Sequence, residues 1–358
     1  MKLKISLILP IVLCLGLSAC DASGTVNEKT EAVSASSETN GAESMESDET
    51  QIYVIYYGES KKQSYNRLFS EGVKSFTEEP GIVVTELVGN NAQELETAVS
   101  IACENGADTI LAASAELGDY LTKYAELYPE IQFVSLDVSI DLPNVQSVYL
   151  EKKEAFFVAG AAAAMITESA ELSGINEDQV IGWIGGMNIP IVQEYYQAFE
   201  QGARFMNPEI VVLEDYVGSW DDIQKGKDTV LSQIEQKVDI VMAAASAAGQ
   251  GILEGAREHG VYLIEMETES DAEIKCHGTV AASIAEKPEQ VGMILMEELI
   301  NNRFEGGAVR YLTLKDDAVD FIFNTTSDGI LLLPEEIRTQ CKDIAEKIRS
   351  GEILVGNP

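Results

Sequence analysis

The stretch IYVIYYGESKKQSYNRLFSEGVKSFTEEPGIVVTELV, residues 52–88, holds two apolar runs on either side of a more polar segment. Within that segment, apolar and aromatic side chains recur every three or four residues, at Tyr65, Leu68, Phe69, Val73 and Phe76. This spacing is typical of one face of an α-helix. The flanking runs are rich in β-branched and aromatic residues, which favours strands. A strand, a helix and a second strand in this order predict a parallel sheet covered by helices.

The same alternation continues along the chain and then restarts. After the first set comes a long predicted helix from Lys153 to about Ser169, and VIGWIGG at 180–186 begins a second set. Two successive sets of about four βα units predict an α/β protein with two doubly wound lobes and a cleft between them. We expect residues 52–155 and about 304–358 to form lobe one, and 156–303 to form lobe two. The late runs VRYLTL and VDFIF are both expected to complete lobe one.

The N-terminal segment predicts export and lipid anchoring. Lys2 and Lys4 precede a short apolar core that ends at Leu17-Ser18-Ala19-Cys20. This pattern indicates a signal peptide over residues 1–19, and its end resembles a bacterial lipobox in which Cys20 is lipidated. An ordinary secretory cleavage site is the alternative. Residues 20–51 contain few large apolar side chains, so we expect the lipidated cysteine to be followed by a disordered acidic tether.

Charge and cysteine usage exclude several classes of function. The formal net charge of the chain is −36 at pH 7, which repels phosphate backbones and anionic lipid headgroups. We therefore expect no nucleic-acid partner and no membrane binding through a basic patch. The cysteines Cys103, Cys276 and Cys341 are widely separated and match no metal-binding spacing, so structural thiols and no metal site are expected.

Several segments, taken in order, resemble one family. They are SYN at 64–66, AELYPEIQFVSLD at 125–137, PNVQSVYL at 143–150, EAFFVAGAAAAMIT at 154–167, IGWIGGMNIPIVQEYYQAFEQGAR at 181–204, DYVGSWDDIQKGK at 215–227 and AAGQGILEGA at 247–256. Their order and spacing resemble those of the basic membrane lipoproteins, which include purine-nucleoside receptor lipoproteins of ABC transporters. The resemblance implies a type I periplasmic-binding fold with three crossovers, a ligand in a hinged cleft, no cofactor and no catalysis.

Four candidate ligand-binding residues belong to lobe one. Ser64, Tyr65 and Asn66 follow the first predicted strand. The helical stripe explains Tyr65 and helix capping explains Ser64, whereas packing leaves Asn66 unexplained. The resemblance implies that the Tyr65 ring stacks on a nucleobase and that Asn66 bonds to it. Asp137 ends IQFVSLD, at the carboxyl end of a strand, and the resemblance implies that it accepts hydrogen bonds from ribose hydroxyls.

The remaining candidates belong to lobe two. In GSWDD, Ser219 and Asp222 resemble a capping box, which would place Trp220 in the first helical turn at the cleft rim or pack it over Ile223. The resemblance adds Val217, Met242 and Gly249 to the ligand site. Glu267 stands where the family has a ribose-binding aspartate, and Glu286, followed by Lys287, stands where a lysine is expected.

A nucleotide-phosphate loop is the alternative reading of the lobe-two glycines. Gly182, Gly185 and Gly186 have GxxGG spacing rather than GxGxxG, which favours a tight turn near the cleft.

The predicted function is that of an extracytoplasmic solute-binding lipoprotein of an ABC importer. We expect a monomer with a purine-nucleoside-like ligand and with permease and ATPase subunits as partners. A ligand-sensing lipoprotein that signals to a membrane partner is the alternative. An oxidoreductase is disfavoured, because His259 and His277 are the only histidines and neither lies in a catalytic motif.

Overall fold

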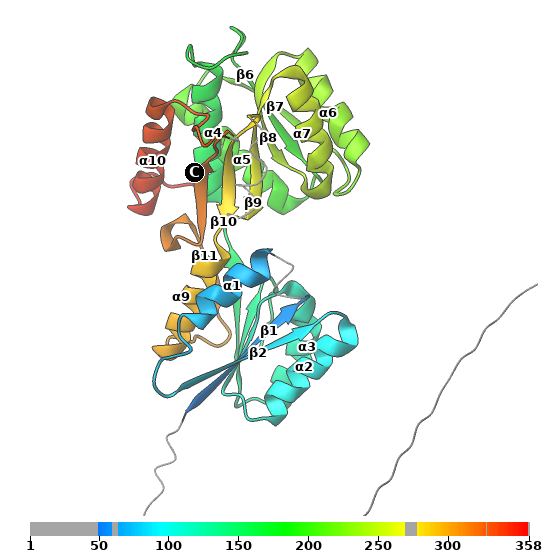
Figure 1. Cartoon of the computed structure of the whole chain (residues 1–358), viewed down its shortest axis with the longest axis vertical. Coiled ribbons are helices and arrows are strands. Elements are labelled where there is room, and N and C mark those ends of the chain that lie inside the picture. The colour runs from blue at the N-terminus through cyan, green and yellow to red at the C-terminus, as the bar shows by residue number, and fades with distance from the viewer. Residues whose placement is uncertain (1–48, 59–63, 269–277, 327, 357–358) are drawn as a thin grey trace, which may run out of the picture. The chain divides into compact units, whose positions relative to one another are not determined.

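The computed structural model describes residues 49–58, 64–268, 278–326 and 328–356, and these residues form two separate β-sheets (Figure 1). The first sheet has the strand order β11-β5-β4-β3-β1-β2, and every described pairing in it is parallel. This confirms the predicted α/β class. Its strands are β1 (Thr50–Tyr57), β2 (Ile82–Gly89), β3 (Thr109–Ala112), β4 (Gln132–Leu136), β5 (Val145–Leu150) and β11 (Val309–Leu312).

Strand β1 shows why helices cover both faces of this sheet. Successive side chains of a strand point to opposite faces, and all five residues from Ile52 to Tyr56 are buried. Ile52, Val54 and Tyr56 pack in one cluster with Phe69 of helix α1, while Tyr53 and Ile55 pack in another cluster. Helices α1 (Ser64–Lys74) and α9 (Pro288–Ile300) lie side by side, and α2 (Ala92–Glu104) and α3 (Gly118–Leu127) contribute to the second cluster (Figure 1).

The second sheet has the strand order β12-β10-β9-β8-β6-β7. Its described pairings are parallel except that of β12, which runs antiparallel to β10. Its strands are β6 (Val180–Gly185), β7 (Val211–Tyr216), β8 (Val238–Ala244), β9 (Tyr262–Thr268), β10 (Val280–Glu286) and β12 (Val319–Phe323).

Helices also pack on both faces of the second sheet. Helices α6 (Ile223–Glu235) and α7 (Gly249–His259) share a hydrophobic cluster with Ile184 and Val241. Helices α4 (Lys153–Thr167), α5 (Pro190–Met206) and α10 (Glu335–Arg349) pack with Trp183. Helices α4 and α5 approach closely at Gly160, where a Cβ would lie 1.8 Å from the Phe199 carbonyl oxygen. Only glycine fits at this contact.

The chain passes between the two sheets three times, as the resemblance implies, but one late strand does not join the sheet that was expected. The passages follow β5, β10 and β11, and the backbone N–H of Glu151 donates to the carbonyl of Leu312 where two of them meet. VRYLTL forms β11 in the first sheet, as expected. VDFIF forms β12 in the second sheet, and α10 packs on α4, so the expectation that both runs complete lobe one is wrong for VDFIF. Hydrophobic periodicity identifies a strand but not its partner.

The predicted N-terminal segments lie almost entirely outside the described residues. This applies to the signal peptide at 1–19, to Cys20 and to the tether up to residue 48. Strand β1 begins at Thr50, so the last two residues assigned to the tether belong to the sheet. Within the described ranges, no helix combines the length and apolar character needed to cross a bilayer.

Candidate ligand-binding site

Three charged side chains lie at the carboxyl ends of parallel strands. Asp137 follows β4 directly, Lys152 lies two residues after β5, and Glu286 is the last residue of β10. The Lys152 Nζ lies 2.7 Å from a carboxylate oxygen of Glu286. Ligands of open α/β folds bind outside the carboxyl ends of the strands, so these residues mark a candidate site. Together with two tyrosines described below they form what we call the charged cluster: Tyr65, Asp137, Lys152, Tyr195 and Glu286.

The backbone at Asp137 has a conformation that few residues adopt. Its φ is 59°, in the left-handed region that aspartate tolerates better than most residues, and its N–H donates to the carbonyl of Val148 at 2.8 Å. The residue is exposed, yet desolvation by surrounding protein atoms raises the pKa of its carboxyl. The positive charge of Lys152 opposes this rise in pKa, and the negative charge of Glu286 adds to it. An exposed but desolvated carboxylate is partly enclosed, as a ligand-binding carboxylate must be.

Lys152 is held firmly in its charged form. Its side chain is 14% exposed, and burial alone would lower the pKa of the ammonium. The negative charges of Glu286 and Asp137, with Tyr195, outweigh this and raise the pKa of Lys152 well above its usual range. Lys152 therefore carries a full positive charge at any physiological pH.

Two tyrosine rings complete the charged cluster. The Tyr65 ring stacks on Phe69 with centroids 6.3 Å apart, and it packs against the hydrophobic core as the helical stripe predicts. Burial first, then the charges of Glu286 and Asp137, raise the pKa of Tyr65. The Tyr195 ring, from α5, stacks on Phe156 at 4.5 Å. Burial and nearby carboxylates raise the pKa of Tyr195, although the positive charge of Lys152 opposes them. The phenols of Tyr65 and Tyr195 therefore stay protonated and can donate hydrogen bonds.

Asn66 has a structural explanation that the sequence did not reveal. Its side chain is 3% exposed, and its Nδ2 donates to the carbonyls of Tyr57 at 2.8 Å and Gly58 at 3.3 Å. The amide therefore ties the start of α1 to the end of β1. The view that packing leaves Asn66 unexplained is wrong, because its amide bonds to the last residue of β1 and to the residue that follows it. Ser64 begins α1, and its side chain lies outside the described part of the structure.

The Trp220 ring packs against the backbone of a glycine. A Cβ at Gly186 would lie 2.3 Å from the Trp220 Cε3 and 2.5 Å from Cζ3, so the ring rests directly on this backbone. Trp220 remains 42% exposed. Gly182 and Gly185 lie within β6, and the N–H of Gly186 donates to the carbonyl of Ala244 at 2.9 Å. That N–H already donates to a backbone carbonyl and cannot also hold a phosphate, which agrees with the rejection of a phosphate loop here.

The cap of α6 differs from the prediction. Asp222 is the N-cap residue, and its carboxylate accepts from the N–H of Lys225 at 3.0 Å. The Ser219 hydroxyl instead accepts from the N–H groups of Asp221 and Asp222, both at 3.2 Å. Trp220 therefore lies in the loop before the helix, not in its first turn. The capping-box spacing predicted Ser219 as the N-cap and Asp222 as its partner, whereas the structure has Asp222 as the N-cap.

Two predicted residues of lobe two offer no surface to a ligand. Val217 and Met242 have 0% exposure, Val217 in the cluster against α6 and α7 and Met242 within β8. Gly249 begins α7 and lines a cavity of about 370 Å³ at the carboxyl ends of β8 and β9, where a Cβ would meet nothing within 4 Å. The cavity is lined by Ala243, Ala244, Ala245, Ser246, Ala247, Gly249, Gln250, Leu253, Glu265 and Met266.

Glu267 and Lys287 occupy different positions relative to the charged cluster. Glu267 lies in β9 and pairs with Ala285 of β10, the residue that directly precedes Glu286. The side chain of Glu267 lies outside the described part of the structure. The Nζ of Lys287 lies 2.8 Å from a carboxylate oxygen of Asp317. The ammonium beside Glu286 is thus supplied by Lys152 from a distant part of the sequence.

Sequence reasoning missed Lys152 and Tyr195 as members of the site. Lys152 follows a predicted strand almost as closely as Asp137 does, so the rule that selected Asp137 also selects Lys152. Tyr195 carries no such signal, because it lies inside a helix whose aromatic residues Tyr196 and Phe199 pack in or against the core.

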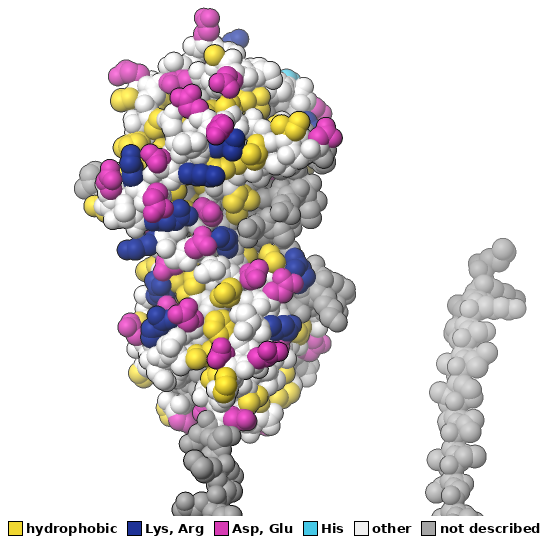
Figure 2. Space-filling view, turned by 60° about the vertical axis from the view of Figure 1, so that its left-hand side comes forward, with side chains coloured by type: hydrophobic (Ala, Val, Ile, Leu, Met, Phe, Trp, Pro, Cys, Tyr) yellow, Lys and Arg dark blue, Asp and Glu magenta, His cyan; other side chains and the backbone are white. Residues whose placement is uncertain are grey.

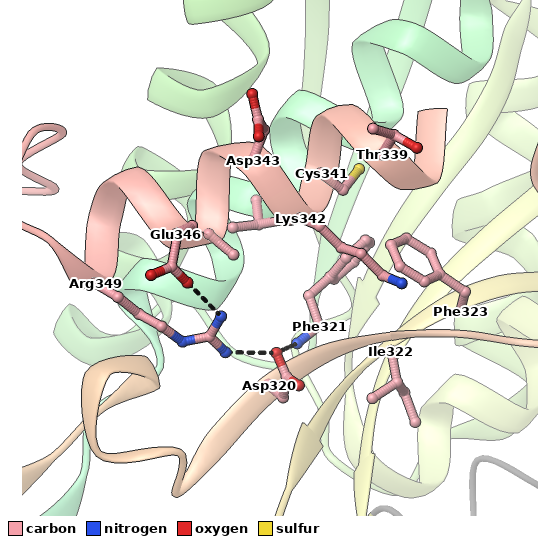
Figure 3. A pocket seen from close by; sticks show the side chains of 12 residues that line it. Asp320, Phe321, Ile322, Phe323, Thr339, Cys341, Lys342, Asp343, Glu346 and Arg349 are labelled. Carbon is pink, nitrogen blue, oxygen red and sulfur yellow. Dashed lines mark hydrogen bonds and ion pairs between the residues drawn. The ribbon is translucent and has the colours of Figure 1, made fainter. Parts of the chain in front are cut away.

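A larger cavity lies away from these residues. It has a volume of about 650 Å³ and lies between α10 and β12, as Figure 3 shows. Three of its charged groups are paired with one another, since Arg349 contacts Asp320 at 3.3 Å and Glu346 at 3.8 Å. No predicted ligand-binding residue lines it. The cavity is therefore not the predicted site.

Two of the three cysteines expected to be structural thiols lie among the described residues. Cys103 and Cys341 are buried free thiols, and burial raises their pKa to about 11 and about 12, which makes them unreactive. Cys276 lies outside the described residues. Among the described residues no group of His, Cys, Asp and Glu could hold a metal ion. On the face drawn in Figure 2, Lys and Arg side chains are interspersed with Asp and Glu rather than gathered into a basic patch.

Comparison with known proteins places these features in a wider context. A protein-family profile described as "ABC transporter substrate-binding protein PnrA-like" matches residues 49–357. Basic membrane protein A2 of Borrelia garinii subsp. bavariensis is 24% identical over 322 residues, covering 88% of this chain and 91% of that protein. The ABC transporter nucleoside-binding protein BmpA of Lactococcus lactis subsp. cremoris is 25% identical over 298 residues, covering 74% of this chain and 79% of that one.

The fold has solved counterparts. A solute-binding protein of an ABC transporter system from Aeropyrum pernix K1 superposes with a TM-score of 0.61 at 18% identity, covering 86% of this chain and 94% of that one. The architecture is that of the type I periplasmic-binding proteins, as the sequence predicted.

Proposed function

Because the chain belongs to the family of PnrA-like ABC transporter substrate-binding proteins, we propose that it binds a purine nucleoside or a similar small polar ligand. The family binds solutes and does not catalyse reactions, and its transporter context implies a permease and an ATPase as partners. The proposed site lies at the carboxyl ends of the parallel strands in the two sheets. The nucleoside itself is suggested by one distant relative, the nucleoside-binding BmpA of Lactococcus lactis.

One observation carries the proposal: Tyr65, in the first turn of α1 after β1, and Asp137, directly after β4, both lie at the carboxyl ends of parallel strands of the first sheet. An aromatic ring beside a desolvated carboxylate suits a ligand that has a flat base and a sugar with hydroxyl donors. Trp220, Gly249 and Glu267 are the proposed contacts from the second sheet, and Ser64 is a further candidate. We propose that Asn66 acts on the ligand by positioning the start of α1.

The experiment is isothermal titration of the purified protein with inosine, guanosine, adenosine and their 2′-deoxy and 3′-deoxy forms. Loss of a hydroxyl that Asp137 accepts from should weaken binding by about 1–3 kcal/mol, because the carboxylate is then left without its partner. Xylose and arabinose serve as sugar controls that lack the base. Absence of binding to every purine nucleoside would rule out this ligand class.

We further propose that Cys20 is lipidated and anchors the protein at the extracytoplasmic face of the membrane. The relatives named basic membrane protein support membrane association in general. Mass spectrometry of the mature N-terminus measures the modification directly. A Cys20→Ser variant should leave the membrane fraction, and retention there would contradict the proposal.

A further inference from the structure

The charged cluster contains two carboxylates for one ammonium. Asp137 and Glu286 are the carboxylates and Lys152 is the ammonium, and the pKa of each described phenol in the cluster is raised, so both phenols are neutral. The described members of the cluster therefore carry one net negative charge. A ligand seated there meets an excess of negative charge and two phenolic donors.

Lys152 is not available to balance an additional anion. Its Nζ lies 2.7 Å from Glu286, and both side chains are largely buried, at 14% and 22% exposure. The adjacent Lys153 lies 3.0 Å from Glu151 and 3.3 Å from Glu194. A phosphate brought to the cluster would have to break an enclosed ion pair to reach an ammonium, and it would face Asp137 as it did so.

We propose that the Lys152–Glu286 pair makes this site select uncharged or cationic ligands and reject phosphorylated ones. Glu286 is the residue that sets this selection, since it neutralises the ammonium that would otherwise attract an anion. The inference rests on the proposed function, because it places the ligand at the charged cluster. It goes further in naming the charge class of the ligand and the residue pair that decides it.

A graded series of charge variants tests the selection without knowledge of the natural ligand. Inorganic phosphate is the probe, titrated into the full chain at fixed ionic strength and followed by ³¹P NMR. Glu286→Gln and Asp137→Asn each remove one negative charge, and the double variant removes both. We expect phosphate affinity to rise at least tenfold from the parent to the double variant, with the single variants between them.

Matched control variants remove the same number of negative charges at positions outside the charged cluster. Asp317→Asn removes one negative charge and breaks the 2.8 Å contact with Lys287, and Asp317→Asn combined with Glu297→Gln removes two. Both controls should bind phosphate as weakly as the parent. Equal affinity across the cluster series, or an equal gain in the controls, would overturn the proposal. Because Asp137 is exposed, Asp137→Asn keeps the series informative even if Glu286→Gln folds poorly.

A second titration separates this inference from the proposed function. The parent protein is titrated with adenosine, adenosine 5′-monophosphate and 5′-amino-5′-deoxyadenosine. Binding of the first and third but at least tenfold weaker binding of the monophosphate supports the selection. Equal binding of adenosine and its monophosphate overturns the selection and leaves the proposed function intact. Failure of all three, together with a graded phosphate response, refutes the nucleoside ligand and supports the selection.

Discussion

The Nζ of Lys152 and a carboxylate oxygen of Glu286 lie 2.7 Å apart, although the two residues are far apart in sequence. Lys152 follows a strand of the first sheet and Glu286 ends a strand of the second, so both lie where the chain passes between sheets. The pair joins two of the three passages at the carboxyl ends of the strands. Changes to it should affect both stability and the ligand site.

Replacing Lys152 with Met should destabilise the protein by about 3 kcal/mol, because it leaves Glu286, whose side chain is 22% exposed, without its counter-ion. Urea unfolding measures the change. The double variant Lys152→Met/Glu286→Met should recover most of the loss, since the unpaired charge is then removed. Lys287→Met is the control: its partner Asp317 is 48% exposed, so the cost should stay below about 1 kcal/mol. Equal costs for the two lysines would contradict the role assigned to Lys152.

Replacing Asn66 with Ala should destabilise the protein by about 1–3 kcal/mol, because the carbonyls of Tyr57 and Gly58 lose a donor whose side chain is only 3% exposed. The change in unfolding free energy is the measurement. Asn301→Ala removes a similar bond, from Nδ2 to the carbonyl of Glu297 at 2.8 Å, at an exposed site and should cost under about 0.5 kcal/mol. A stable Asn66→Ala variant with weakened ligand binding would instead support direct contact between Asn66 and the ligand.

Ligand affinity should depend on pH through Asp137. Desolvation raises the pKa of this carboxyl above its usual 3.8, so protonation begins at a higher pH than for an ordinary aspartate. Because the carboxylate is the proposed hydrogen-bond acceptor, affinity should fall as the pH is lowered towards this raised pKa. Titration calorimetry between pH 7 and pH 4 measures the fall, and Asp137→Asn should remove it.

The same pKa shift has the opposite sign for stability. A carboxyl whose folded pKa is raised is destabilising while ionised, and this penalty disappears as the pH falls through the folded pKa. Asp137→Asn should therefore melt no lower than the parent at neutral pH, because asparagine also tolerates the left-handed backbone at this position. A clearly lower melting temperature would indicate that the ionised carboxylate stabilises the fold.

Replacing Gly186 with Ala should displace the Trp220 ring, because the new Cβ would lie within 2.5 Å of two ring atoms. Overpacking of this kind costs about 1–3 kcal/mol. The chain has two tryptophans and Trp183 is fully buried, so a red shift in fluorescence emission would report Trp220. Gly249→Ala is the control for stability and emission, since open space surrounds that position. An unchanged spectrum in Gly186→Ala would show that the ring adjusts without moving into solvent.

The sequence predicted most of the secondary structure and the position of Asp137. Hydrophobic periodicity located the helix that carries Tyr65, Phe69 and Val73, which is α1, because its apolar face must be buried whatever it packs against. The rule that ligands bind at the carboxyl ends of parallel strands selected Asp137 without structural information. The same rule could have selected Lys152. It could not have selected Tyr195, whose position depends on how α5 packs.

The amino-acid sequence by itself determined the α/β class, the parallel sheets and the resemblance to a known family, because these depend on local periodicity and on the order of motifs. Only the tertiary structure decided that VDFIF joins the second sheet, that Asn66 is bonded to the end of β1, and that Lys152 is the partner of Glu286. The physical reason is that strand pairing, buried hydrogen bonds and ion pairs join residues that are distant in sequence, and no local pattern records which distant residue will be the partner.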